Sequence, residues 1–154
     1  MKKTTRETIG AFIIISVAYI ASYTLVAGFI APLQELILPT FTTSISLLFL
    51  PHGIRILAAY YYGWKALPLL LPSMYLMWFI TVYANNISLH PLSPLFSGIA
   101  CIIAVKFIFK NIKHIIEKEW KLLLLAGLVG SFLNGLSHSF LVYKSFLTIS
   151  FIGY

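Results

Sequence analysis

The chain has 154 residues, of which 60% are hydrophobic and only 10% are charged, and its mean hydropathy is +0.93. Soluble domains carry about 25% charged residues, so this composition excludes a soluble globular protein and indicates an integral membrane protein. The net charge of +7 does not indicate nucleic-acid binding, because the basic residues lie mainly at the ends of apolar runs, which is the positive-inside pattern of membrane proteins.

The apolar runs predict an all-α fold, a polytopic transmembrane helix bundle that forms a single membrane domain. A helix needs about 20 residues to cross the hydrocarbon core, and five runs approach this length: 9–32, 43–62, 66–83, 95–109 and 122–143. The first run is too long for the apolar core of a signal peptide, so it is interpreted as an uncleaved helix. The apolar tail, residues 145–154, is too short to span and is expected to be interfacial, re-entrant or the start of a sixth span.

The second predicted span is interrupted near its middle. Pro51 removes a backbone donor and clashes with the preceding turn, and Gly53 adds backbone freedom two residues later. The helix is therefore expected to kink or to start again at this point. The short turn at residues 63–65 predicts that the second and third spans are antiparallel neighbours.

The basic residues predict the orientation of the bundle. Most of them fall on one side of the predicted spans: Lys2, Lys3, Arg6, Lys65, Lys110, Lys113, Lys118 and Lys121. The loops on the opposite side, residues 33–40 and 84–94, contain no Lys or Arg. The positive-inside rule therefore predicts a multi-pass protein whose N-terminus is cytoplasmic.

Arg55 places a permanent positive charge inside the second span, where ionisable groups are costly and usually functional. His52 lies three residues before it and shares its face if this segment is helical. All acidic residues lie outside the predicted spans, at Glu7, Glu35, Glu117 and Glu119. Three explanations for Arg55 stay open: snorkelling to the interface, bonds to carbonyls freed by the helix break, or an anionic group of a lipid, ligand or partner.

The last span carries a second unusual face. Four of its residues recur at intervals of four, three and four and therefore line one stripe: Gly127, Ser131, Asn134 and His138. The two small residues, Gly127 and Ser131, predict close packing against another helix. The two polar side chains are expected to face the bundle interior near His52 and Arg55, or to act simply as interhelical hydrogen-bonding groups.

No catalytic residue, metal site or cofactor is predicted. The sequence has no serine-histidine elbow, no aspartate pair and no His-Glu-x-x-His metal motif. Two histidines on different helices could ligate a haem iron, but nothing else in the sequence supports this reading. Cys101 is the only cysteine, so it forms no disulfide within the chain.

The run from Leu50 to Ile54, which contains Pro-His-Gly, is followed by four further residues of a recognisable pattern: Ala58, Ala59, Gly63 and Pro68. This segment, about residues 49–73, resembles the MASE1 class of bacterial membrane sensor domains. Arg55 departs from the pattern, since a small or apolar residue is expected there. The resemblance implies a sensory module in a bacterial inner (cytoplasmic) membrane.

The sequence as a whole predicts a non-enzymatic membrane module that senses a small polar or anionic ligand, or docks a membrane partner, through a broken helix. Besides the bilayer itself, the expected partners are a second copy of the chain, another membrane protein, an anionic lipid or a small ligand. The alternative is a subunit of a small transporter or channel, because broken helices with a central charge also build permeation sites.

Overall fold

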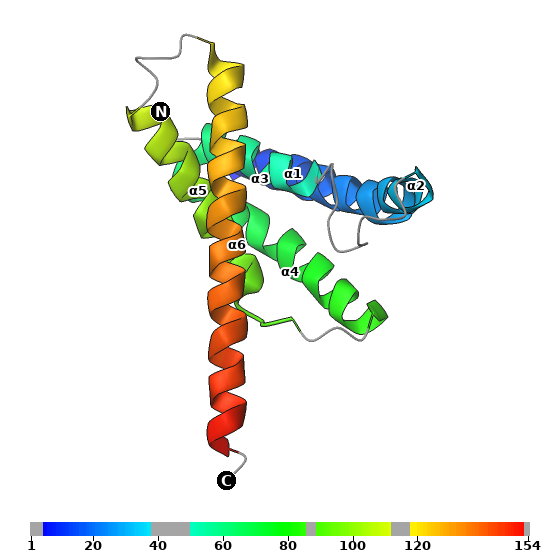
Figure 1. The fold of residues 1–154 in the computed structure, drawn as a ribbon. Coiled ribbons are helices and arrows are strands. Elements are labelled where there is room, and N and C mark those ends of the chain that lie inside the picture. The colour runs from blue at the N-terminus through cyan, green and yellow to red at the C-terminus, as the bar shows by residue number, and fades with distance from the viewer. Residues whose placement is uncertain (1–4, 38–49, 86–88, 112–117, 153–154) are drawn as a thin grey trace.

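The computed structural model describes residues 5–37, 50–85, 89–111 and 118–152, and all regular structure within them is helical. The elements are α1 (Thr5–Leu25), a π-helical segment η1 (Val26–Ile30), α2 (Ala31–Ile37), α3 (Leu50–Tyr62), a 3-10 turn η2 (Gly63–Lys65), α4 (Ala66–Asn85), α5 (Ser93–Asn111) and α6 (Glu119–Ile152). The prediction of an all-α membrane protein is confirmed (Figure 1).

Four stretches of the described chain are long and apolar enough to cross a membrane, rather than the five predicted. They are Arg6–Ile37, Leu50–Ala84, Ser93–Asn111 and Glu119–Leu141. The second stretch contains both α3 and α4. The described part of α3, 13 residues, rises about 20 Å at 1.5 Å per residue. Residues 43–49 of the predicted second span lie outside the described residues.

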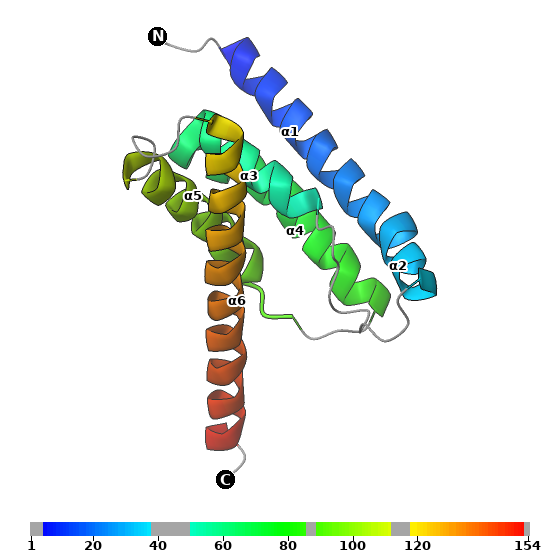
Figure 2. The same cartoon turned by 45° about the horizontal axis from the view of Figure 1, so that its top comes forward.

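Gly63 reverses the chain between α3 and α4. Its φ of 55° is in the left-handed region, which glycine adopts without a steric penalty. Figure 2 shows α3 and α4 folding back from this turn, and both helices contact each other and α1. The antiparallel pairing expected from the short turn is therefore present.

The buried side chains form two clusters, and α3 contributes to both. The first joins Ala58 of α3 to one face of α1 and one face of α4: Ala11, Ile15, Tyr19, Leu69, Leu70, Met74 and Met77. The second joins Ile56 and Ala59 of α3 to α5 and α6: Cys101, Ile102, Val105, Ile108, Leu122 and Ala126. Helix α3 is therefore the central element that holds the two halves of the bundle together.

Helix α6 also carries an outward apolar stripe. Five large side chains recur every four residues and are each more than half exposed: Leu124, Leu128, Phe132, Leu136 and Phe140. Residues four apart share one face of a helix, and exposed apolar surface of this extent suits contact with lipid tails. The second half of α6 extends beyond the ends of the other helices (Figures 1 and 2).

Two helix ends differ from those expected. The first helical stretch continues beyond residue 32 through α2 to Ile37, with the π-helical segment between. Helix α6 continues beyond residue 143 to Ile152, so the tail from residue 145 to 152 extends this helix. Pro51 is the second described residue of α3. Residues 38–49 lie outside the described chain, so a break before Pro51 stays a prediction.

Gly130 is the glycine of α6 that allows α3 to approach. A Cβ atom built there would lie 3.2 Å from Ile56 Cδ1 and 3.4 Å from the His52 ring, whereas one built at Gly135 meets nothing within 4 Å.

Gly130→Leu is therefore expected to force α3 and α6 apart and to cost about 1–3 kcal/mol of stability. Gly135→Leu is the matched control, and its melting temperature in detergent should be unchanged or slightly higher. Equal melting temperatures for the two variants would contradict this packing.

Candidate functional site

A pocket of about 260 Å³ lies among α1, α3, α4, α5 and α6. Its lining is drawn from one face of each helix and from the connection before α5: Tyr19, Tyr23, Arg55, Met74, Met77, Trp78, Thr81, Leu89, Ser93, Pro94, Ser97, Asn134 and His138. The spacing on each helix explains this convergence. The lining residues of α4 are separated by three, one and three positions, and those of α1 and of α6 are four positions apart. Such spacing places the residues of each helix on a single face.

Arg55 is the charged residue at the inner wall of this pocket. Only 4% of its surface is exposed, and its Nη1 donates a hydrogen bond to Ser97 Oγ on α5. A guanidinium is charged at any physiological pH and presents several donors in one plane. The pocket therefore has a fixed positive charge with hydrogen-bond donors facing the bundle interior.

The amino-terminal end of α5 lies beside this charge. Ser93 is the first residue of α5 and lines the pocket one turn before Ser97. Its backbone N–H donates to the carbonyl of His90 at 2.9 Å, which fixes the entry of the chain into the helix. The positive end of the helix dipole adds to the field of Arg55 here, so both features favour an acceptor or a negative charge.

The opposite wall is held by a short hydrogen-bonded chain between α1 and α4. Thr81 Oγ1 donates to the carbonyl of Met77 at 2.8 Å and lies 2.8 Å from Tyr23 Oη. A threonine hydroxyl carries a single proton, so Tyr23 is the donor in the second bond. The aromatic and thioether side chains on this side form an apolar surface that faces the polar wall of α3 and α5.

Three of the four residues predicted to recognise a ligand line the same pocket. Arg55 comes from α3, and Asn134 and His138 come from α6, as expected for a polar stripe facing the second predicted span. His52 is not among the lining residues. The sequence placed His52 with Arg55 because they are three residues apart, but this spacing still separates their directions by about 60° around a helix of 3.6 residues per turn.

His52 instead ties α3 to α6 and α5. Its Nε2 lies 3.0 Å from the carbonyl oxygen of Gly127, so this nitrogen carries the proton and donates. Its Nδ1 then faces Cys101 Sγ on α5 at 3.8 Å. The ring also lies beside Gly130, where α3 and α6 are closest. In this structure His52 is a packing residue at the junction of three helices.

The remaining predicted positions have less contact with the pocket. Gly127 supplies its carbonyl to His52, but a Cβ atom built there meets nothing within 4 Å, and the side chain of Ser131 is exposed. Contact of these two residues with a second chain stays a prediction. Gly53 lies within the continuous helix α3 and also meets nothing within 4 Å.

Sequence reasoning missed the α4 wall and the serines of α5. The α4 segment is apolar on every side, so its periodicity does not distinguish the pocket face from the lipid face. The serines were available as a signal, since Ser93 and Ser97 are four residues apart at the start of an otherwise apolar helix. No group of three or more His, Cys, Asp or Glu side chains within the described ranges is arranged to hold a metal ion.

Comparisons with protein-family models, curated proteins and solved structures found no match to this chain. The likeness to MASE1 domains therefore stays an expectation carried by the residues around Pro51. The pocket itself is the observation from which function is argued below.

The histidines of α3 and α6 offer a test of their different roles. His52→Ala removes a hydrogen bond to a backbone carbonyl and leaves space between three helices, so it is expected to cost about 1–3 kcal/mol. The side chain of His138 is exposed, so His138→Ala should change stability by less than about 0.5 kcal/mol. Thermal unfolding of both variants in the same detergent measures the difference. A larger loss for His138→Ala would contradict the structural role of His52.

Proposed function

We propose that this chain is a non-enzymatic membrane module that binds a small polar or anionic ligand in the pocket beside Arg55. The observation that carries the proposal is the convergence of a buried arginine with Asn134 and His138 on one cavity. Concave sites with an apolar lining and a few convergent polar groups are the usual form of small-ligand sites. The volume of about 260 Å³ suits a ligand smaller than a typical drug.

The cost of burying Arg55 supports a role in recognition. An arginine at the centre of a membrane helix costs about 2.5–3.5 kcal/mol on insertion scales. Its hydrogen bond to Ser97 offsets part of this cost, but a neutral residue would join α3 to α5 without a charge. An arginine is useful where the other side of the pocket receives an acceptor or an anion.

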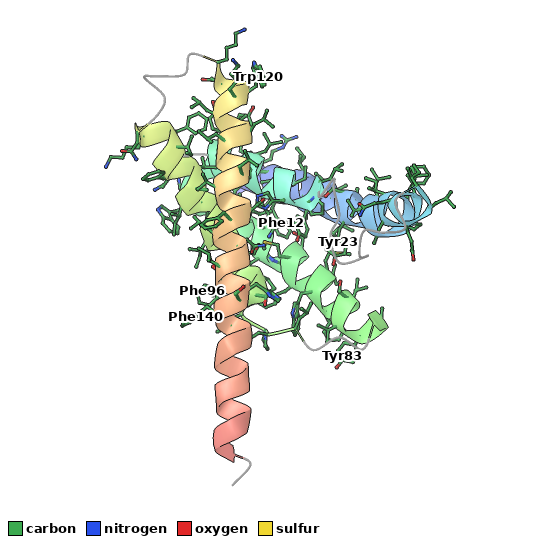
Figure 3. All side chains as sticks on the ribbon, viewed as in Figure 1. Phe12, Tyr23, Tyr83, Phe96, Trp120 and Phe140 are labelled. Carbon is green, nitrogen blue, oxygen red and sulfur yellow. The ribbon has the colours of Figure 1, made fainter. Side chains whose placement is uncertain are left out.

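The distribution of charge supports a cytoplasmic N-terminus and a pocket that opens on the other side of the membrane. The start of α1, the turn after α3, the end of α5 and the start of α6 lie at one end of the molecule (Figure 2). Trp120 marks this end and Tyr83 the opposite end (Figure 3). Basic side chains gather at the first end, at Lys65, Lys106, Lys110 and Lys121, as the positive-inside rule requires of a cytoplasmic face.

The pocket belongs to the end opposite the basic residues. Leu89, in the connection between α4 and α5, and Ser93 both line it. A ligand would therefore enter from outside the cytoplasm and reach Arg55 through the bundle. This placement suits a sensory or partner-docking module in a bacterial inner membrane, as the MASE1-like segment implies.

A subunit of a small transporter or channel is the second candidate, and the π-helical segment Val26–Ile30 favours it. Such segments are rare, and they are often found at functional sites. This one directly continues the helix that supplies Tyr19 and Tyr23 to the pocket. Irregular helices beside a charged central site are typical of transporters.

Removal of the Arg55 charge should remove the ligand without unfolding the protein. In native mass spectrometry of protein extracted gently from its membrane, a small bound mass is expected with the wild type and not with Arg55→Gln. Glutamine keeps a donor for Ser97 but loses the charge. Lys106→Gln is the matched control, because Lys106 lies over the Trp64 ring at 5.2 Å and does not line the pocket. Identical spectra for wild type and Arg55→Gln would contradict the proposal.

Flux separates the two candidate functions. A binding module reconstituted in proteoliposomes is expected to move no more of its ligand than empty vesicles do. Arg55-dependent uptake above that background would assign the pocket to a transporter instead.

A further inference from the structure

Several hydrogen-bond donors near Arg55 are available to a ligand, and they indicate its chemistry. Ser93 Oγ and Trp78 Nε1 are buried atoms with no hydrogen-bond partner among the described residues, and both residues line the pocket. An indole N–H can only donate, and a serine hydroxyl donates as well as accepts. Ser97 accepts from Arg55, so its own proton is also available for donation. A ligand that meets this demand presents acceptors.

The charge of the pocket limits the ligand to one negative charge. Arg55 is the permanently charged residue among the lining side chains, which include no Lys, Asp or Glu. One anionic group balances one guanidinium, whereas a second would be left without a counter-charge inside the bundle, where such charges are costly. A carboxylate fits this demand, because its two oxygens match the planar donors of an arginine.

The cavity is small, and its α4 side is mainly apolar. Met74, Met77 and Trp78 form one continuous face of α4 opposite the polar wall. The cavity volume of about 260 Å³ lies just below the range of about 300–1,000 Å³ that is usual for small-molecule sites. A small ligand fits that space, with its charged end on α3 and α5 and its apolar body on α4.

We propose that the Arg55 pocket binds a small monocarboxylate with an apolar, aromatic-sized body. The carboxylate contacts Arg55 and the donors at the start of α5, and the body contacts the methionines and Trp78 of α4. This inference rests on the proposed ligand-binding function and specifies the ligand class of the same site.

Tryptophan fluorescence provides a direct test, because Trp78 lines the pocket and the chain has only two other tryptophans. Trp64 and Trp120 are each more than half exposed and lie outside the pocket lining. The Trp64→Phe/Trp120→Phe variant in detergent therefore reports on the pocket through Trp78 alone. Benzoate is the monocarboxylate probe, benzamide its neutral counterpart, and succinate and inorganic phosphate are the more highly charged probes.

Benzoate is expected to change the emission of Trp78 in a saturable way. Benzamide should bind about 10-fold to 100-fold more weakly, since a hydrogen bond to a charged group is worth about 1.5–3 kcal/mol. Succinate and phosphate should bind no better than benzamide. In the same background, Arg55→Gln should weaken benzoate binding by a similar factor, Ser93→Ala by about 2-fold to 10-fold, and Lys106→Gln should leave it unchanged.

The outcomes separate the ligand class from the function. If benzamide binds as tightly as benzoate, the ligand does not need a carboxylate and the proposed ligand class is wrong. If phosphate or succinate binds more tightly than benzoate and this binding depends on Arg55, the pocket is an anion site but the limit to a single negative charge is wrong. An Arg55-dependent mass in native spectra without saturable benzoate binding would reject the class alone. Absence of both would reject the function as well. If Arg55→Gln does not fold, the Ser93→Ala variant provides the test. Unchanged benzoate affinity in Ser93→Ala would contradict the proposed contact between the carboxylate and Ser93.

Discussion

The hydrogen bond from Arg55 to Ser97 is the interaction on which the interior of this protein depends. It joins α3, the helix shared by both buried clusters, to the first turns of α5. A buried guanidinium needs acceptors from its surroundings, because water and lipid tails cannot supply them inside the bundle. Ser97 accepts a hydrogen bond from the guanidinium, and Ser93 lines the same pocket one turn earlier, so a largely apolar bundle has a polar interior wall.

Close approach of the helices depends on small residues, which place this wall. A Cβ atom built at Gly98 on α5 would lie 2.9 Å from Leu67 Cδ1, and one built at Gly130 on α6 would lie against Ile56 and His52 of α3. Small residues at helix contacts in membranes allow backbones to approach and gain dispersion contacts. The hydrogen bond from His52 to the Gly127 carbonyl then fixes how α6 is rotated. Asn134 and His138 are presented to the pocket as a result of that rotation.

Much of the architecture follows from local sequence signals, whereas the contents of the pocket do not. The third and fourth predicted spans, 66–83 and 95–109, agree with α4 and α5 within two residues at each end, because long apolar runs bounded by polar loops leave few alternatives. One of the two sequence readings of Asn134 and His138 placed them near Arg55, and all three residues line the pocket. The sequence could not show that His52 contacts α5 and α6 and not the pocket. His52 and Arg55 point about 60° apart around α3, and tertiary packing decides which neighbour each side chain meets. The predicted last span ended at residue 143 because about 20 residues suffice to cross the hydrocarbon core, but α6 continues as a helix to Ile152.

The division of the buried side chains into two clusters has a mechanical consequence. The pocket runs along the seam between them, with α1 and α4 on one side and α5 and α6 on the other. Each side has its own buried cluster, and the two sides meet at α3 and where Gly98 of α5 packs against Leu67 of α4. Packed units that slide or tilt against one another as rigid bodies are a common way for occupancy of a site to be transmitted over distance. In this chain the lever would be α6, whose 34 residues carry a small rotation at the pocket to a larger displacement at the far end of the helix.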